Sequence, residues 1–298
     1  MSLLDRAVVT LLPAVPRPVV RKLSSRYIAG PELADARRVV AQLNAQGKLA
    51  TVDVLGEEIT RVEEAAVITR AYLDVLDAID EDALEANVSV KLTGLGLKLD
   101  PALAKENLKA IAARGTFVRI DMEDSSTTDA TLRLYRELVD DGHRNLGVVL
   151  QAALRRTVDD ARTLAGANVR VCKGIYIEPL DVAFRGFDEI RDSYLRTLDA
   201  LLDGEAYVAI ATHDEYLVTQ SLRAVRERGL DGSRYELQML LGVRPELGDR
   251  IVSDGHRLRI YVPFGSHWYE YSLRRLQENP KIAGYVAGDL GRSLLKRG

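Results

Sequence analysis

Eight short runs rich in β-branched residues recur along the chain, separated by longer segments in which apolar residues repeat with helical spacing. Segment 128–139 places apolar side chains at positions i, i+3, i+4 and i+7, which is typical of one face of an amphipathic helix. A strand followed by a helix, repeated in this way, is the pattern of a (βα)8 barrel. The predicted strands are residues 49–55, 88–92, 117–122, 146–151, 169–173, 207–212, 235–240 and 258–264.

An open doubly wound sheet is the main alternative for alternating strands and helices. When such a sheet binds a dinucleotide, a GxGxxG turn follows an early strand, and this sequence contains no such turn and no P-loop. The units extend over about 250 residues, the usual length of a closed barrel. We therefore predict an α/β protein with a (βα)8 TIM-type barrel.

The barrel pattern divides the chain into two predicted regions. Residues 1–47 are expected to form an N-terminal helical arm, and residues 48–298 to form the barrel. The apolar stretch 7–15 is interrupted by Pro13 and is too short to span a bilayer. Asp5 precedes this stretch and no cleavage site of small residues follows it, so we expect no signal peptide.

Charge and cysteine content narrow the class of protein. The 298 residues include 41 Lys or Arg and 44 Asp or Glu, and the resulting net charge of −3 argues against nucleic-acid binding. A hydrophobic fraction of 47% is ample for a packed core and excludes a disordered chain. The single cysteine, Cys172, excludes an intramolecular disulfide and a thiolate zinc cluster. We therefore expect a cytoplasmic protein without a metal centre.

Charged side chains fall on the strand faces that should line the barrel interior. Strand side chains alternate, and the outward face packs on helices, so the polar phase of each strand is expected to point inward. Buried charge is costly unless paired, and active sites of such barrels lie at the C-terminal ends of the strands. We predict a site there that contains Lys91, Asp121, Gln151, Arg170 and Tyr261. A purely structural ion pair between Lys91 and Asp121 is the alternative.

The predicted last helix, residues 267–279, ends before Pro280 and carries Arg274 and Arg275. Two neighbouring arginines can bind a carboxylate through paired hydrogen bonds. Arg274 can equally form a surface ion pair with Glu278, one turn along the helix. The spacing alone does not decide between these two interpretations.

An ordered set of motifs resembles the monofunctional bacterial proline dehydrogenases. No single motif is decisive, but together they follow the family's order from about residue 50 to about residue 280. The motifs are SVKLTGLG (89–96), FVRIDMEDS (117–125), VVLQ (148–151), VRVCKGIY (169–176), ATHD (211–214), YELQMLLGVRPE (235–246), RIYVPFG (259–265) and YSLRRLQENP (271–280). The resemblance implies a distorted (βα)8 barrel that holds FAD without a Rossmann fold and has its C-terminal helix over the active site. It also implies oxidation of L-proline to Δ1-pyrroline-5-carboxylate, the first step of proline catabolism to glutamate.

The resemblance assigns roles to individual positions. Asp121 and Arg170 match catalytic residues, with Arg170 beside flavin N5. Lys91, Arg274 and Arg275 match the residues that bind the carboxylate of the substrate. Tyr261 matches the tyrosine that packs on the proline ring, and Leu240 matches a residue in the wall of the substrate pocket. The FAD-binding positions are Met122, Gln151, Arg170, Lys173, Gly174, Ile175, Thr212, His213 and Glu278. The family commonly has alanine where this chain has Ile175.

Asp121 is interpreted as an orienting partner for Lys91 rather than as a base. An aspartate near several cations has a lowered pKa, and this weakens it as a proton acceptor. A cation beside the flavin, Arg170, would stabilise the charge that develops on reduction.

The resemblance implies three partners: L-proline, a membrane quinone that accepts the electrons, and a pyrroline-5-carboxylate dehydrogenase as a candidate recipient of product. A quinone acceptor would place this cytoplasmic protein peripherally at the inner face of the membrane. Two other hypotheses stay open. One is an aldolase-type barrel that forms a Schiff base through Lys91 or Lys173. The other is a non-enzymatic scaffold, which the polar strand ends disfavour.

Overall fold

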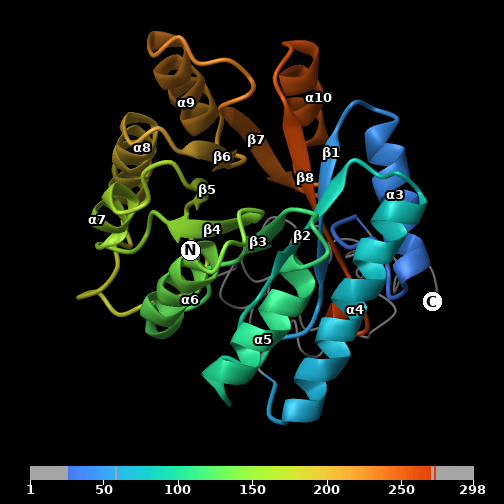
Figure 1. Ribbon diagram of the computed structural model, residues 1–298. Helices are drawn as coiled ribbons and strands as arrows, with labels where there is room; N and C mark the ends of the chain where they lie inside the picture. The colour runs from blue at the N-terminus through green and yellow to red at the C-terminus, as the bar shows by residue number, and fades with distance from the viewer. Residues whose placement is uncertain (1–25, 58, 270–271, 273–298) are drawn as a thin grey trace, which may run out of the picture.

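The computed structural model describes residues 26–57, 59–269 and 272, which are built around a closed barrel of parallel strands (Figure 1). Each strand pairs with its neighbours in chain order, and β1 pairs with β8 to close the barrel. The predicted barrel is confirmed, and each strand matches its predicted range to within two residues at either end. The strands are β1 (Leu49–Val54), β2 (Ala86–Val90), β3 (Val118–Ile120), β4 (Leu146–Gln151), β5 (Asn168–Cys172), β6 (Tyr207–Ala211), β7 (Tyr235–Leu240) and β8 (Leu258–Phe264).

The helices surround the strands in chain order, so helices that are neighbours in the sequence are also neighbours around the barrel (Figure 1). The first described helix, α3, packs against β1 and β8, where the two ends of the sheet meet. Within the described residues, no helix has both the length and the apolar character needed to cross a bilayer. The helices are α3 (Leu33–Asn44), α4 (Val62–Glu81), α5 (Pro101–Ala112), the 3-10 turn η2 (Ser125–Thr127), α6 (Thr128–Asp140), α7 (Thr157–Arg162), α8 (Phe187–Asp203), α9 (Glu215–Glu227) and α10 (Pro245–Ser253).

Side-chain caps fix where several helices begin. Asp100 accepts a hydrogen bond from the N–H of Ala102, and Pro101 occupies the first turn of α5, where its missing N–H is not needed. Asp124 caps η2 and Asp214 caps α9 in the same way. Because both aspartates come shortly after a strand, they also set the direction of the chain at the mouth of the barrel.

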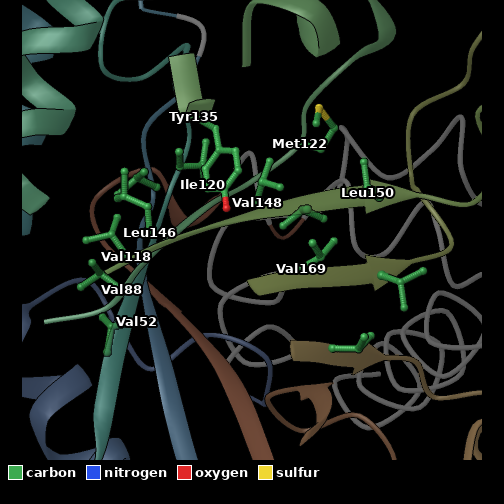
Figure 2. Packing of buried hydrophobic residues seen from close by; sticks show 14 of the residues in the cluster. Val52, Val88, Val118, Ile120, Met122, Tyr135, Leu146, Val148, Leu150 and Val169 are labelled. Atoms are coloured by element: carbon green, nitrogen blue, oxygen red, sulfur yellow. The ribbon is translucent and has the colours of Figure 1, made fainter. Parts of the chain in front are cut away.

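The outward faces of the strands form an apolar layer beneath the helices. Ile120, Val148 and Val169 lie side by side in the register of three neighbouring strands, and none has exposed surface. Figure 2 shows Tyr135 of α6 together with Ile120 and Val148 in this layer. Each such side chain contributes on the order of 2 kcal/mol relative to an exposed one. This gain explains why the outward phase is apolar.

The interior of the barrel is polar, and a small residue on one strand makes room for a long side chain from its neighbour. Arg119 of β3 lies beside Gly147 of β4, and a Cβ at Gly147 would lie 2.5 Å from Arg119 Nη1. Arg119 crosses β4 at this point, and its Nη1 donates to the carbonyl of Asn168 at 2.7 Å. Hydrogen-bonded polar side chains therefore occupy space that apolar layers fill in many barrels of this type.

Candidate active site

Lys91 lies at the mouth of the barrel, one residue beyond β2, and is bonded to a carboxylate from the neighbouring strand. Its Nζ donates to both carboxylate oxygens of Asp53 at 2.9 Å and lies 4.0 Å from Glu57 Oε2. The Asp53 side chain has no exposed surface. Burial lowers the pKa of Lys91, but the carboxylates of Asp53, Asp121 and Glu57 raise it by more, so Lys91 is charged at neutral pH.

Asp121 lies just beyond β3 and accepts hydrogen bonds from three other strands. Its Oδ1 accepts from Arg170 Nη1 at 2.6 Å and from Ser89 Oγ at 2.7 Å, and its Oδ2 accepts from the hydroxyl of Tyr261 at 2.8 Å. Burial tends to raise the pKa of Asp121, but Arg170 and Lys91 bring it below its ordinary value. Asp121 is therefore ionised and poorly suited to accept a proton.

The predicted pairing of Lys91 with Asp121 was wrong. The register sets Asp53 of β1 beside Ser89 of β2, two residues before Lys91, while Arg170 reaches Asp121 from β5, with one strand between them. Sequence alternation does signal Asp53, because it occupies the phase opposite the buried apolar residues of β1. Asp53 was not among the predicted site residues, although its side chain is fully buried.

Arg170 of β5 spans the interior of the barrel. Its Nε donates to Gln238 Oε1 at 2.5 Å, its Nη1 donates to Asp121, and its guanidinium lies 5.4 Å from the centre of the Tyr261 ring. Its Nη2 is buried and has no hydrogen-bond partner among the residues that the structure describes. A buried donor without a partner costs about 1–3 kcal/mol, so this atom is suited to a ligand that supplies an acceptor.

Lys173 follows β5 and belongs to a charged cluster at the rim of the mouth. Its Nζ lies 2.6 Å from Asp214 Oδ2, and Asp214 also accepts from Arg191 Nη2 of α8 at 2.8 Å. Both cations stack on the ring of Phe187, at 4.5 Å for Lys173 and 4.1 Å for Arg191. Asp214 thus holds Lys173 in a fixed place beside the end of β5.

Gly174 and Ile175 continue this loop. Gly174 has φ +94°, and a Cβ there would lie 3.0 Å from Gln151 Oε1, so both the backbone and the space favour glycine. Gln151, the last residue of β4, donates from Nε2 to the carbonyl of Glu123 at 2.6 Å. Ile175 is 51% exposed and presents an apolar side chain at the surface.

The remaining predicted positions divide between the mouth, the core and the chain end. Thr212 and His213 follow β6, and His213 Nε2 accepts from the N–H of Leu240, the last residue of β7, at 2.8 Å. Met122 packs in the apolar cluster (Figure 2), whereas Asp121 is bonded to the polar side chains of the site. Three predicted positions lie outside the described residues: Arg274, Arg275 and Glu278.

Tyr176 is a further residue at the mouth that the sequence did not single out. Burial, and then the nearby carboxylates of Glu57 and Glu123, raise the pKa of its hydroxyl. Glu123 is itself buried and is bonded to the N–H and hydroxyl of Thr93. The signal for Tyr176 lay in its position three residues after Lys173, the last residue of the fifth predicted strand.

The Schiff-base hypothesis finds no support in the lysines at the mouth. A lysine that attacks a carbonyl must be neutral and accessible. Lys91 is held charged by both oxygens of Asp53, and Lys173 is paired with Asp214. Each ammonium group therefore serves as a fixed positive charge.

A closed parallel barrel with connected, buried charges at the C-terminal ends of its strands defines a (βα)8 enzyme. The family model for proline dehydrogenase matches residues 36–178 and 180–287 of this chain. Proline dehydrogenase 1 of Bacillus subtilis is 37% identical over 270 residues, which cover 88% of each chain. The proline dehydrogenase of Deinococcus radiodurans is 32% identical over 274 residues, covering 89% of this chain and 88% of that protein. The chain belongs to the proline dehydrogenase family and is an oxidoreductase that acts on proline.

Solved structures give an independent view of the fold. Proline utilization A from Bdellovibrio bacteriovorus matches with a TM-score of 0.81 and 23% identity over 92% of this chain and 36% of that protein. The corresponding protein from Corynebacterium freiburgense matches with a TM-score of 0.75 and 20% identity over 96% of this chain and 34% of that protein. The present chain thus spans about a third of the length of these larger proteins and shares their barrel fold.

Proposed function

We propose that this chain oxidises L-proline to Δ1-pyrroline-5-carboxylate with FAD as its cofactor and passes the electrons on to a quinone. The main support for this proposal is the hydrogen bonding of the Arg170 guanidinium. Two of its nitrogens are bonded inside the barrel, and Nη2 is buried without a partner among the described residues. A cation with a spare donor at this place suits a cofactor that gains negative charge on reduction.

The residues around Arg170 fit a flavin. Gly174 allows the loop to pass close to Gln151, since a Cβ there would lie only 3.0 Å from Gln151 Oε1. Lys173 offers a fixed positive charge beside it for the cofactor's phosphates. Ile175, Thr212, His213, Met122 and Glu278 complete the proposed set of contacts. Because Met122 points into the apolar cluster, its contact would be made by the backbone.

The substrate carboxylate needs cations beyond those at the centre of the mouth. Lys91 is bonded to Asp53, and Arg170 is bonded to Asp121, so each is already paired with a carboxylate. Arg274 and Arg275 are proposed to supply the additional positive charge. Lys91 would add its remaining hydrogen-bonding capacity on one side of the carboxylate.

Oxidation removes two electrons and two protons from proline. The ring CH2 carbon that is bonded to nitrogen and does not carry the carboxylate loses one of its two hydrogens as a hydride, the ring nitrogen loses a proton, and a carbon–nitrogen double bond forms between these two atoms. The bound flavin supplies the acceptor for the hydride. Asp121, kept ionised by Arg170 and Lys91, holds the hydroxyl of Tyr261 in place under the proposed ring position, and Leu240 would close the side of the pocket.

Three further statements belong to the proposal. The electrons pass to a membrane quinone, so the protein acts in the cytoplasm and peripherally at the inner face of the membrane. The product passes to a pyrroline-5-carboxylate dehydrogenase. Residues 48–298 form the catalytic barrel and residues 1–47 an arm, of which α3 packs against β1 and β8.

The proposal is tested by the visible spectrum of the purified protein. We expect a yellow protein whose flavin absorbance bleaches when L-proline is added without oxygen. The double variant Arg274→Met with Arg275→Met should keep the flavin but show a Michaelis constant for proline raised by about 100-fold or more, because two charged hydrogen bonds are lost. A colourless protein that gains no activity with added FAD would refute the cofactor, and unchanged proline affinity in the variant would refute the carboxylate clamp.

A further inference from the structure

A chain of buried polar side chains runs through the barrel behind Arg170. Arg259 Nε of β8 donates to Glu236 Oε1 of β7 at 2.8 Å, and Gln238 Nε2 donates to the same oxygen at 2.6 Å. Gln238 Oε1 then accepts from Arg170 Nε at 2.5 Å. The chain continues through Arg170 Nη1 to Asp121. It thus connects the inner part of β7 and β8 with the mouth of the barrel.

The chain can form because the intervening strand, β6, contributes an alanine to the interior. The register places Arg170 of β5 beside Ala209 of β6, and Ala209 beside Glu236 of β7. Ala209 has no exposed surface and only a methyl group to offer. The side chain of Arg170 can therefore cross β6 and reach Gln238, two strands away from its own.

Glu236 fixes which end of the Gln238 amide faces Arg170. Burial raises the pKa of Glu236, but Arg259, Gln238 and Arg119 together bring it below its ordinary value, so the carboxylate is ionised and accepts hydrogen bonds only. The amide nitrogen of Gln238 must point toward Glu236, and its oxygen must consequently point toward Arg170. A glutamine without this neighbour could turn over and place its N–H₂ group against the guanidinium, where two donors would oppose each other.

We propose that Gln238, oriented by Glu236, is a positioning residue that fixes the guanidinium of Arg170 so that its buried Nη2 is kept for the cofactor. The proposal rests on the proposed function, in which Arg170 acts beside the flavin. With Nε bonded to Gln238 and Nη1 bonded to Asp121, the plane of the guanidinium is held from both sides of the barrel. Gln238 itself acts only through Arg170.

The test is a double-mutant cycle between Gln238→Met and Arg170→Met. Gln238→Met keeps the length of the side chain and removes both hydrogen bonds. We expect kcat for proline to fall by about 10- to 100-fold, the cost of a misplaced catalytic group, with KM changed by less than about twofold. The midpoint potential of the bound flavin should also fall, because a displaced cation stabilises the reduced form less. When Arg170 is already methionine, Gln238→Met should lower kcat by less than about twofold.

The matched control is Thr51→Val, which removes another buried hydrogen bond of the barrel interior. Thr51 Oγ1 donates to Asn87 Oδ1 at 2.5 Å, away from Arg170. This variant should lose stability but keep kcat and the flavin potential. If Gln238→Met leaves both quantities as they are, or lowers kcat equally with and without Arg170, Gln238 does not position Arg170.

Urea unfolding of the same variants separates this proposal from the proposed function. Gln238→Met and Arg170→Met remove the same hydrogen bond. The double variant should therefore lose less free energy of unfolding than the sum of the losses in the two single variants. This coupling needs no flavin. A wild-type protein that neither binds flavin nor oxidises proline would refute the proposed function. Additive losses of stability would refute the contact between Gln238 and Arg170, even in an active flavoprotein.

Discussion

At the scale of single residues, two small side chains allow two arginines to cross the barrel interior. Arg119 passes over Gly147 to reach Asn168, and Arg170 passes over Ala209 to reach Gln238. In both cases the arginine and its hydrogen-bond partner lie on strands that are separated by one other strand. The residue of that intervening strand at the crossing point is a glycine or an alanine, which leaves space for the arginine side chain. The interior charges therefore depend on residues that carry no charge themselves.

Gly147→Ala should destabilise the protein because the added methyl group has no room. The new Cβ would lie 2.5 Å from Arg119 Nη1 and 2.6 Å from the backbone oxygen of Asn168, and the backbone oxygen cannot move aside cheaply. We expect a loss of about 1–3 kcal/mol in the free energy of unfolding, measured by urea titration. Gly232→Ala is the control, since its Cβ would come no closer than 3.8 Å to Arg257 Cδ. Equal stability of the two variants would contradict the crossing of Arg119 over β4.

At the scale of elements, a helix on the outside contributes to the site inside. The hydroxyl of Tyr72 in α4 lies between β1 and β2, where it accepts from the N–H of Val54 at 3.3 Å and lies 2.7 Å from the carbonyl of Ser89. The same hydroxyl lies 3.2 Å from Asp53 Oδ1. Tyr72 therefore connects the packing of α4 to the carboxylate that holds Lys91.

Asp214 joins three elements, and its charge should make their connection depend on pH. The hydrogen bonds from Arg191 lower the pKa of Asp214, and Lys173 lowers it further. Burial acts in the opposite direction but is outweighed, so the pKa lies below its ordinary value. A carboxylate whose pKa is lower in the folded state than in the unfolded state stabilises the fold at any pH above its unfolded-state pKa of about 3.9. This stabilisation is lost as the pH falls through the folded-state pKa. Asp214→Asn keeps an oxygen to cap α9 but removes the charge. Its Tm should be about 2 °C lower than that of the wild type at neutral pH.

The difference between these two proteins should stay constant from about pH 7 to about pH 5 and shrink below about pH 4, where the unfolded carboxylate becomes protonated. Calorimetric scans across this range provide the measurement. A difference that stays the same down to the lowest pH would show that Asp214 acts through its hydrogen-bond geometry and not through its charge.

At the scale of the whole molecule, one apolar cluster holds the described helices and strands together. It includes Val40 of α3, Ile120 of β3 and Val262 of β8. Elements from the beginning, the middle and the end of the described chain therefore belong to the same hydrophobic core. This cluster surrounds the polar interior, whose charged side chains reach the C-terminal ends of the strands. Filling the mouth with a ligand should therefore stabilise the entire fold and not only a loop.

Added FAD should raise the Tm of the flavin-free protein. A ligand at about 100 times its dissociation constant stabilises the folded state by about 2.7 kcal/mol, which corresponds to a rise of about 5 °C in a domain of this size. Riboflavin, which lacks the phosphates proposed to meet Lys173, is the matched control and should produce a smaller rise. If FAD produced no rise at all, the proposed cofactor site would be wrong.

The strands and the faces of their side chains were determined by the sequence, because alternation with period two and helical spacing are local properties of the chain. The inward positions of Asp121, Arg170 and Tyr261 followed from alternation alone, and the structure brings these three side chains into contact. Which charges pair was decided only by the tertiary structure. Lys91 binds Asp53 because β1 lies beside β2, and Arg170 reaches Gln238 because Ala209 leaves space on β6. These contacts depend on the register of strands far apart in the sequence and on the volume of the residue between them, neither of which a local pattern contains.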